Sequence, residues 1–231
     1  MRAVTFRSAL LAATLLAMPA TAQEALYGAL PPRDSAYLRF VNTLPAEATA
    51  QVDTRPAQAL GTAQAQRIGP YTVVEAVEGR QVRLTAQSGG RSVELALPIK
   101  SGSFQTVLLQ RGPDGAPMLH AWTDNAEFNQ LRARLSFYNA TTDCPAAGLA
   151  LASNNSAVMR DVAPGSGSVR SVNPVNAVVN ATCEGRPPLP VTLEGLEAGN
   201  MYSIWMMPGQ GGPQAFLAKD VVTPWRRPPG G

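Results

Sequence analysis

The chain contains a single histidine, His120, and this limits the acyl-transfer chemistry that it could perform. Enzymes that transfer acyl groups through a serine need an imidazole to accept the serine proton and an acid to orient that imidazole. Pro117 stands three residues before His120, where an Asp-x-x-His motif would place its acid, and the sequence has neither a Gly-Asp-Ser segment nor a Gly-x-Ser-x-Gly motif. We therefore expect no catalytic residue and interpret His120 as a structural or interdomain side chain.

Metal and phosphate sites are not indicated either. One His and two distant Cys do not give the usual zinc spacings, and the carboxylates are dispersed rather than grouped as in calcium loops. Glu194 and Glu197 flank a turn, which fits solvated side chains better than a glycosidase pair, whose members generally come from different elements. The Gly-rich segment 209–212 lacks the lysine and the helix of a phosphate-binding loop. The sequence thus predicts no metal and no cofactor.

The two cysteines, Cys144 and Cys183, are expected to form a disulfide. In an exported protein this is the simplest use of two cysteines. They enclose about 40 residues, for which the chain-entropy model gives roughly 4 kcal/mol of stabilisation. The alternative, two free thiols with a catalytic or metal-binding role, lacks a supporting His or a nearby second Cys.

Aromatic residues are the remaining candidates for ligand contact. Trp205 lies in a segment with large apolar groups on both faces, which favours burial over stacking on a sugar. Trp225 precedes Arg226 and Arg227 in a proline-rich tail, where a ring beside two guanidinium groups could contact a partner or a polyanion. A disordered tail is the alternative. Trp122 is expected to pack between domains.

The N-terminus has the organisation of a secretory signal peptide. Arg2 and Arg7 precede an apolar run over 9–18, and Ala20-Thr21-Ala22 supplies the small residues of a cleavage site. The uncharged run is shorter than the roughly 18–20 residues that a membrane span needs, so an uncleaved anchor helix is the less favoured alternative. We expect residues 1–22 to be removed, residues 23–32 to form a leader, and the protein to be periplasmic.

Composition and charge exclude several other classes. Removal of the signal peptide lowers the formal net charge from +3 to +1, because that segment holds two of the 19 basic residues and none of the 16 acidic ones. Without a basic stripe, nothing indicates binding to nucleic acid. A hydrophobic content of 45% excludes a disordered chain, and a charged content of only 15% with 20 Gly and 20 Pro argues against long exposed helices.

A repeat of about 97 residues organises the chain after the leader. Ala36–Asn42 (AYLRFVN) aligns with Ala133–Asn139 (ARLSFYN), and the two segments share Ala, Leu, Phe and Asn at the same spacing. Repeats of solenoids and propellers have about 20–50 residues, so a unit this long is a domain. We predict a first domain over 33–120, a linker over 121–130, a second domain over 131–222 and a flexible tail over 223–231.

Apolar and polar residues alternate within each unit. In 81–86 and 92–97 every second residue is apolar, and Ser88-Gly89-Gly90 supplies a turn between the two segments, which predicts a β-hairpin. Further strands are expected at 36–42, 72–77, 104–110 and 118–122, with counterparts in the second unit and one helical turn within 56–66. This pattern predicts an all-β protein with two tandem antiparallel β-sandwich domains of the immunoglobulin or fibronectin III kind.

The N-terminal block ALYGALPPRDSAYLRFVN, residues 25–42, resembles the opening of the AlgF family of periplasmic alginate O-acetylation proteins, and Tyr27 lies in this block. The resemblance continues in the same order through the second copy of the first strand, the Asn-Pro-Val segment at 173–175 and the Trp and basic residues near the C-terminus. The two cysteines are not part of the family pattern, which leaves open a divergent branch that serves another polymer.

The resemblance implies a non-enzymatic role. In such systems a multipass membrane O-acyltransferase delivers acetyl groups, and separate periplasmic SGNH-type acetyltransferases place them on the polymer. AlgF-like proteins are needed without carrying that catalytic motif. The leading hypothesis is therefore a periplasmic adaptor between these two partners. The candidate contacts to a partner or to the polysaccharide are Trp225, Arg226, Arg227, Trp205 and Tyr27.

Two hypotheses of other classes compete with the adaptor. The first is an exported carbohydrate-binding or adhesion protein of tandem β-sandwiches, unrelated to acetylation, in which Trp205 and Trp225 stack on sugars. The second is an enzyme that carries an acetyl group covalently on a Ser or Tyr. A membrane O-acyltransferase encoded beside this gene would favour the adaptor.

Overall fold

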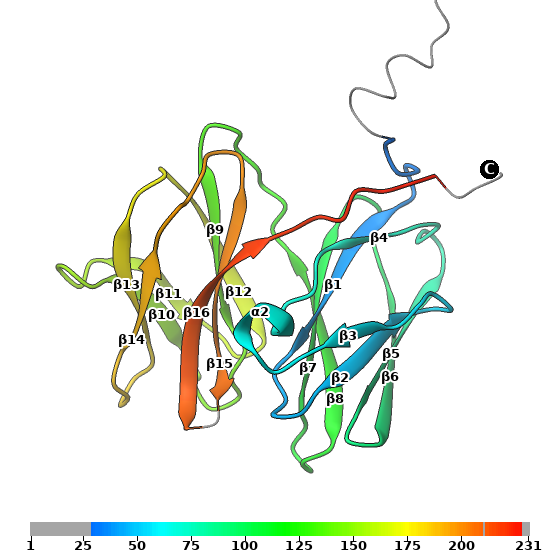
Figure 1. Ribbon diagram of the computed structural model, residues 1–231, viewed down its shortest axis with the longest axis horizontal. Coiled ribbons are helices and arrows are strands. Elements are labelled where there is room, and N and C mark those ends of the chain that lie inside the picture. The colour runs from blue at the N-terminus through cyan, green and yellow to red at the C-terminus, as the bar shows by residue number, and fades with distance from the viewer. Residues whose placement is uncertain (1–28, 210, 228–231) are drawn as a thin grey trace, which may run out of the picture.

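The computed structural model describes residues 29–209 and 211–227. The expected signal peptide, most of the leader and Tyr27 lie outside these residues. Within the described ranges, no helix has the length and apolar character needed to cross a membrane. The chain forms two β-rich halves that lie side by side (Figure 1).

The first domain consists of two four-stranded sheets with the orders β4-β1-β7-β8 and β3-β2-β5-β6. Its elements are β1 (Ala36–Asn42), β2 (Ala48–Val52), β3 (Gln58–Leu60), α2 (Gln64–Arg67), β4 (Thr72–Val74), β5 (Gln81–Ser88), β6 (Arg91–Pro98), β7 (Phe104–Arg111) and β8 (Pro117–Asp124). Buried side chains from both sheets form one core; Leu38 and Val107 come from the first sheet, and Val82 and Leu84 from the second. The two sheets therefore pack face to face as a sandwich.

The second domain repeats this arrangement with the sheets β12-β9-β15-β16 and β11-β10-β13-β14. Its strands are β9 (Ala133–Asn139), β10 (Ala147–Leu151), β11 (Ala157–Val162), β12 (Ser166–Val172), β13 (Ala177–Thr182), β14 (Leu189–Leu193), β15 (Met201–Gly209) and β16 (Gly212–Asp220). Leu135 and Ile204 from one sheet meet Leu149 and Val179 from the other. The predicted tandem β-sandwich fold is confirmed.

The strands of the two domains correspond one to one, β1 to β9 and so on to β8 and β16. Most neighbours are antiparallel, but β1 pairs with β7 in parallel and β9 pairs with β15 in parallel. Between the two strands of each parallel pair, the chain crosses to the other sheet and returns twice, and on the way it forms the antiparallel edge strand β4 or β12. Tyr37 lies opposite Phe104, and Arg134 opposite Met201, so the register of the pair is the same in both domains.

The repeated Ala-x-Leu-x-Phe-x-Asn motif forms the same structure twice. Its Leu and Phe residues are buried in the core of their own domain. Its last residue, Asn42 or Asn139, is fully buried, and the side-chain amide donates two hydrogen bonds to backbone carbonyls of two other segments. A buried amide must be satisfied in this way, which explains why the motif ends on the same residue in both copies.

The predicted hairpin is confirmed as β5 and β6. Ser88 pairs with Arg91, so Gly89 and Gly90 form a two-residue turn, with φ values of 56° and 73°. A turn with two positive φ angles twists as its flanking strands do and favours glycine at both positions.

The boundary between the domains differs from the predicted one. β8 continues to Asp124 because it pairs with β7 along the whole length of that strand, Phe104 lying opposite Asp124. Residues 121–124, expected in the linker, therefore belong to the last strand of the first domain. β9 begins at Ala133.

The segment after β16 returns to the first domain (Figure 1). The Tyr71 amide donates to the Val221 carbonyl, the Thr223 amide donates to the Tyr71 carbonyl, both at 2.8 Å, and Trp225 Nε1 donates to Glu75 Oε1 at 2.8 Å. The prediction of a flexible tail from 223 onwards is therefore wrong for residues 223–225, because these bonds attach them to the first domain.

Candidate functional site

The two domains meet through a buried apolar cluster between their inner sheets, β4-β1-β7-β8 and β12-β9-β15-β16. Val41 and Leu108 of the first domain pack with Tyr138, Trp205 and Phe216 of the second. The cluster exists because alternate residues of β1, β7, β9 and β15 face away from their own domain core. Trp122 packs against it, as predicted for an interdomain side chain. The domains thus share a continuous interface in addition to the linker.

Trp205 was predicted as a candidate contact, and the structure contradicts this. Its exposed fraction is 0%, its ring stacks on Tyr138 with the centroids 4.3 Å apart, and its Nε1 donates to Ser203 Oγ at 2.7 Å. Both faces of β15 are covered, one by the core of the second domain and the other by the first domain. A ring without exposed surface cannot stack on a sugar or bind a partner.

Arg39 of β1 lies fully buried at the centre of the interface. Its Nη1 donates to Asp220 Oδ1 at 2.6 Å, and its Nε donates to Thr106 Oγ1 at 2.9 Å. Both side chains of the ion pair are 0% exposed. Asp220 ends the last strand of the second domain, so this pair connects the first strand of one domain to the last strand of the other.

Three aromatic rings surround the guanidinium group of Arg39. Its Cζ lies 4.3, 5.1 and 5.0 Å from the ring centroids of Tyr71, Tyr138 and Trp205. Burial alone would lower the pKa of Arg39, but the charge of Asp220 and its other neighbours outweigh burial and place that pKa above its ordinary value. Burial raises the pKa of Tyr71 and of Tyr138. Arg39 therefore stays charged and both tyrosines stay protonated, so none of these groups is poised to accept a proton near neutral pH.

Matching hydroxyl and carboxylate pairs complete the buried network. Thr106 Oγ1 donates to Asp124 Oδ2 and Ser203 Oγ donates to Asp220 Oδ1, both at 2.6 Å. The two hydroxyls occupy equivalent positions on β7 and β15, and the two carboxylates end β8 and β16. Two tyrosine hydroxyls also donate to Asp124, at 2.9 Å from Tyr71 and 2.7 Å from Tyr138. The first strand of the second domain has Ser136 at the position equivalent to Arg39, so a single cation serves both halves.

Sequence reasoning missed this network. Arg39 stood inside the repeated motif, and the signal for it was a charged residue within AYLRFVN, a segment that has apolar residues on both faces. The Leu and Phe positions that the two copies share are buried in the core of each domain, and they identified the strand. The residues between them, such as Arg39 and Val41, face the other domain, and their interdomain role is not visible in the pattern.

His120 contacts the second domain. Its Nε2 lies 2.9 Å from the carbonyl oxygen of Gly165. Gly165 has a φ of 66°, and a Cβ at this position would come within 2.7 Å of His120 Nε2. Glycine is therefore required there for both backbone conformation and close approach, and the interdomain interpretation of His120 is confirmed.

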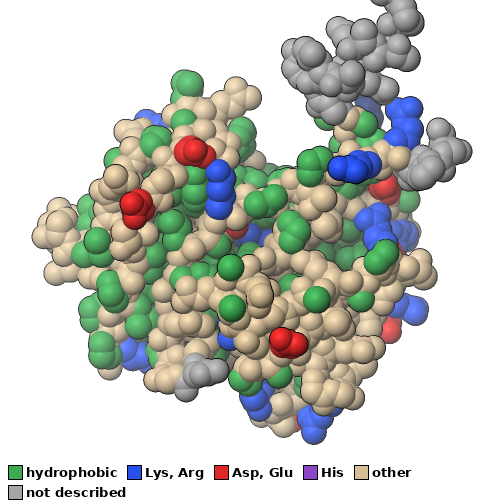
Figure 2. All heavy atoms as spheres, viewed as in Figure 1, with side chains coloured by type: hydrophobic (Ala, Val, Ile, Leu, Met, Phe, Trp, Pro, Cys, Tyr) green, Lys and Arg blue, Asp and Glu red, His purple; other side chains and the backbone are tan. Residues whose placement is uncertain are grey.

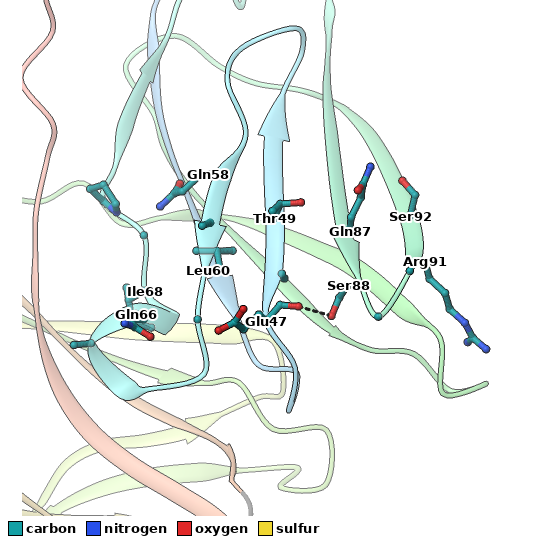
Figure 3. Close-up of a pocket in the computed structure, with 18 residues that line it drawn as sticks. Glu47, Thr49, Gln58, Leu60, Gln66, Ile68, Gln87, Ser88, Arg91 and Ser92 are labelled. Atoms are coloured by element: carbon teal, nitrogen blue, oxygen red, sulfur yellow. Dashed lines mark hydrogen bonds between the residues drawn. The ribbon is translucent and has the colours of Figure 1, made fainter.

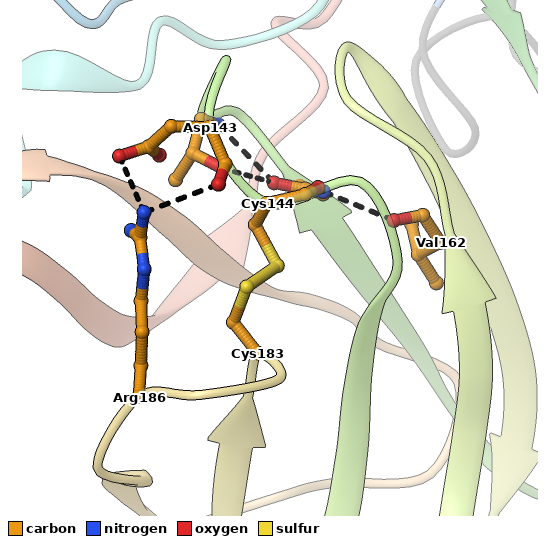
Figure 4. The surroundings of a disulfide bond; sticks show 7 residues. Asp143, Cys144, Val162, Cys183 and Arg186 are labelled. Carbon is orange, nitrogen blue, oxygen red and sulfur yellow. Dashed lines mark hydrogen bonds and ion pairs between the residues drawn. A yellow bond between two sulfur atoms is a disulfide. The ribbon is translucent and has the colours of Figure 1, made fainter.

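The predicted disulfide is confirmed (Figure 4). Cys144, in the loop after β9, is bonded to Cys183, directly after β13, with their Cα atoms 5.8 Å apart. Beside it Arg186 Nη2 donates to Asp143 Oδ2 at 2.7 Å and to the Asp143 carbonyl at 3.1 Å. The hydrogen bond from Arg186 lowers the pKa of Asp143. The disulfide ties the loop between β9 and β10 to the end of β13.

An open groove with a volume of about 800 Å³ lies on the first domain between α2, β3 and the β5–β6 turn (Figure 3). Its polar lining is mostly amide and hydroxyl, from Thr49, Gln58, Gln66, Gln87 and Ser92. In the described part of the chain, two charged side chains line it, Glu47 and Arg91. Such a surface offers hydrogen bonds but no charge clamp and no aromatic platform.

The other predicted contact residues lie apart from Trp205. Trp225 is half-buried against the first domain through Glu75, whereas Arg226 and Arg227 are exposed. Tyr27 lies outside the described residues. On the face shown in Figure 2, acidic side chains are few and scattered, whereas several basic side chains lie close together at the upper right, where the C-terminal segment runs. Trp225, Arg226 and Arg227 are consecutive in the chain and lie on the first domain's side of the molecule, apart from the buried Trp205.

The fold and the interface define a tandem β-sandwich protein whose two domains share one buried polar network. A family model described as "Alginate O-acetyl transferase AlgF" matches residues 8–202. The chain therefore belongs to the AlgF family, as the N-terminal block predicted, and this family is one of alginate O-acetylation.

A search of curated proteins found no match. Among solved structures, the chain is similar to the C-terminal domain of AlgF from P. aeruginosa, with 22% identity and a TM-score of 0.32 over 38% of this chain and 98% of that one. It is also similar to a putative cell adhesion protein from Bacteroides uniformis, with 10% identity and a TM-score of 0.27 over 82% of this chain and 100% of that one.

Proposed function

We propose that the protein is a non-catalytic periplasmic adaptor required for O-acetylation of a secreted exopolysaccharide, alginate or a similar polymer. The observation that carries this proposal is the family match over residues 8–202. The family description contains the word transferase, but the single histidine lies against a backbone carbonyl of the other domain. The buried tyrosines and Arg39 hold their protons, which supports a structural use of these groups rather than catalysis.

The interface also supports a bridging role. An adaptor that joins a membrane O-acyltransferase to a periplasmic SGNH-type acetyltransferase needs two surfaces at a fixed separation. The apolar cluster and the ion pair between Arg39 and Asp220 fix the two domains relative to each other. Such preorganisation reduces the conformational entropy lost when partners bind.

Deletion of the gene tests the proposal. We expect polymer secretion to continue while acetyl ester per sugar residue falls strongly, and the intact gene supplied in trans to restore it. The measurement is acetyl content and total sugar of the secreted polymer. Unchanged acetylation with normal polymer output would refute the adaptor role.

The non-catalytic part of the proposal is tested separately. The purified protein is incubated with an activated acetyl donor and its intact mass is measured. We expect no saturable adduct of one acetyl group, since the buried hydroxyls of Tyr71 and Tyr138 are enclosed by the interface. A stoichiometric adduct that maps to one Ser or Tyr would instead indicate an acetyl relay.

Truncation after Val222 tests the C-terminal contact residues. It removes the Thr223 amide bond to the Tyr71 carbonyl and the Trp225 bond to Glu75, so we expect a small loss of stability, on the order of 1–3 kcal/mol for two hydrogen bonds. We also expect recovery of the acetylation partners in a pull-down to fall several-fold.

The matched control is Trp225→Phe, which keeps the ring and both arginines but removes the bond to Glu75. If Arg226 and Arg227 contact the partners, this variant keeps more partner binding than the truncation. Equal recovery of partners with the truncated and intact proteins would exclude the tail from the binding surface.

A further inference from the structure

Arg67, the last residue of α2, is a buried cation without a carboxylate partner among the described residues. Only 4% of it is exposed. Its Nη1 donates to the carbonyls of Asn42 and Leu44 at 2.9 and 3.0 Å, and its buried Nε has no hydrogen-bond partner in the described part of the chain. Burial lowers the pKa of Arg67, and no acidic neighbour offsets this effect. Since arginine keeps its charge in proteins and buried charges are normally paired, this residue lacks a counter-ion.

Arg67 lines a cavity of about 410 Å³ between the two domains. The second domain contributes the other side of the cavity, with the loop after β9 at 140–143 and the residues Pro208 and Pro213 around the β15–β16 turn. This volume lies in the range of small-molecule sites, roughly 300–1,000 Å³. The cavity exists only where the two domains meet, so it depends on the same interface that buries Arg39.

The charges around the cavity favour an anion. Among the described residues that line it, Asp143 is the one carboxylate, and it is already paired with Arg186 at 2.7 Å, so it does not neutralise Arg67. Arg111, an exposed second cation, also lines the cavity. The remaining walls include the apolar side chains of Leu44 and Pro45. One buried positive charge balances one negative charge, which suits a monocarboxylate better than a phosphate ester with about two negative charges.

We propose that this interdomain cavity binds a small carboxylate ligand, from acetate to a single hexuronate in size, with Arg67 as its buried anchor and Arg111 at its mouth. In this proposal the ligand accepts from the guanidinium nitrogens of Arg67 that are not bonded to backbone carbonyls of the described residues, among them the buried Nε. Hydrogen bonds from a guanidinium to a carboxylate are charge-assisted and stronger than neutral ones. This inference does not depend on the adaptor role, because it concerns binding by the isolated protein.

Calorimetric titration of the purified protein tests the proposal. The probes are sodium acetate and sodium glucuronate, with glucose as the uncharged counterpart of glucuronate and sodium sulfate as a general anion. We expect saturable binding of both carboxylates, competition between them, and no binding of glucose. Absence of saturable carboxylate binding would overturn the proposal, and so would equally tight binding of sulfate or glucose.

Two variants locate the site. Arg67→Gln is expected to weaken glucuronate binding at least tenfold, about 1.4 kcal/mol, while Arg91→Gln, an exposed arginine in the other groove, leaves it unchanged. Arg67 also donates to two backbone carbonyls, so Arg67→Gln could weaken binding by disturbing the fold. Thr142→Trp avoids this problem. Thr142 is exposed and lines the cavity, so a large ring there obstructs the cavity and leaves the bonds of Arg67 in place. Undiminished binding by a folded Thr142→Trp protein would place the ligand elsewhere.

Discussion

Replacement of Arg39 by Met is expected to lower the free energy of unfolding by about 3–5 kcal/mol, the usual cost of removing one partner of a buried ion pair. The variant leaves Asp220 without its cation in a site where both side chains are 0% exposed. It also removes the bond to Thr106 and the contacts with three aromatic rings. Urea unfolding followed by tryptophan fluorescence measures the change, since Trp205 lies at the same interface.

Two controls separate charge burial from loss of packing. In the double variant Arg39→Met with Asp220→Leu no unpaired charge remains, so we expect it to recover a large part of the lost stability. Arg83→Met breaks the exposed pair with Glu94, whose side chains are 66% and 53% exposed, and should cost no more than about 1 kcal/mol. A similar small cost for Arg39→Met would contradict a buried role for the interdomain pair.

The alternation of apolar residues predicted most strands because it reports which face of a strand meets the core of its own domain. This is why the hairpin of β5 and β6, which packs one face against the core and exposes the other, was predicted nearly to its ends. In β9 every residue is buried, and in β1 all but one, because their second faces meet the other domain. Alternation cannot report a second buried face, so Trp205 remained a candidate contact although its segment already looked apolar on both sides.

Contacts between residues far apart in the sequence were also beyond prediction. Arg39 and Asp220 are separated by 181 positions, and Trp225 and Glu75 by 150. Prolines around Trp225 correctly excluded a helix. The prediction of a flexible tail also required that no other part of the protein bind the segment. Glu75, which accepts the hydrogen bond from Trp225, has no sequence pattern around it that marks it as this acceptor. Family membership was predictable for the opposite reason: the block at 25–42 carries specific residue types in a fixed order, which does not depend on tertiary contacts.

The cavity at Arg67 is likewise formed by residues that lie far apart in the sequence. Its walls come from five separate parts of the chain, at 43–45, 67, 110–111, 140–143 and on both sides of the β15–β16 turn, and the sequence gives no reason to bring Arg67 near the residues at 140–143. Only the docking of the domains creates the cavity and leaves the arginine buried. A function that depends on the interface, whether bridging or ligand binding, therefore cannot be predicted from the alternation of apolar residues, even where that alternation predicts the strands correctly.

Removal of the disulfide with Cys144→Ala and Cys183→Ala is expected to cost roughly 4 kcal/mol, because the unfolded chain regains the conformational entropy of a loop of about 40 residues. The bond ties the loop after β9 to the end of β13. In the first domain the corresponding loop has no covalent link to the end of β5; there Ser88 Oγ donates to the Glu47 carbonyl at 2.9 Å, next to the backbone pairing of Ala48 with Ser88. Ser88→Ala should therefore cost only about 1 kcal/mol.

Chemical reduction provides the internal check on this comparison. Dithiothreitol should lower the urea midpoint of the wild-type protein to that of the double-alanine variant and should leave the variant unchanged. Because the entropy is regained in the unfolded state, the loss of stability should appear with little change in the folded-state spectrum. If the double-alanine variant is as stable as the oxidised protein, loop closure by the disulfide contributes nothing to the free energy of unfolding. The disulfide would then stabilise its loop no more than the hydrogen bond of Ser88 stabilises the equivalent loop of the first domain.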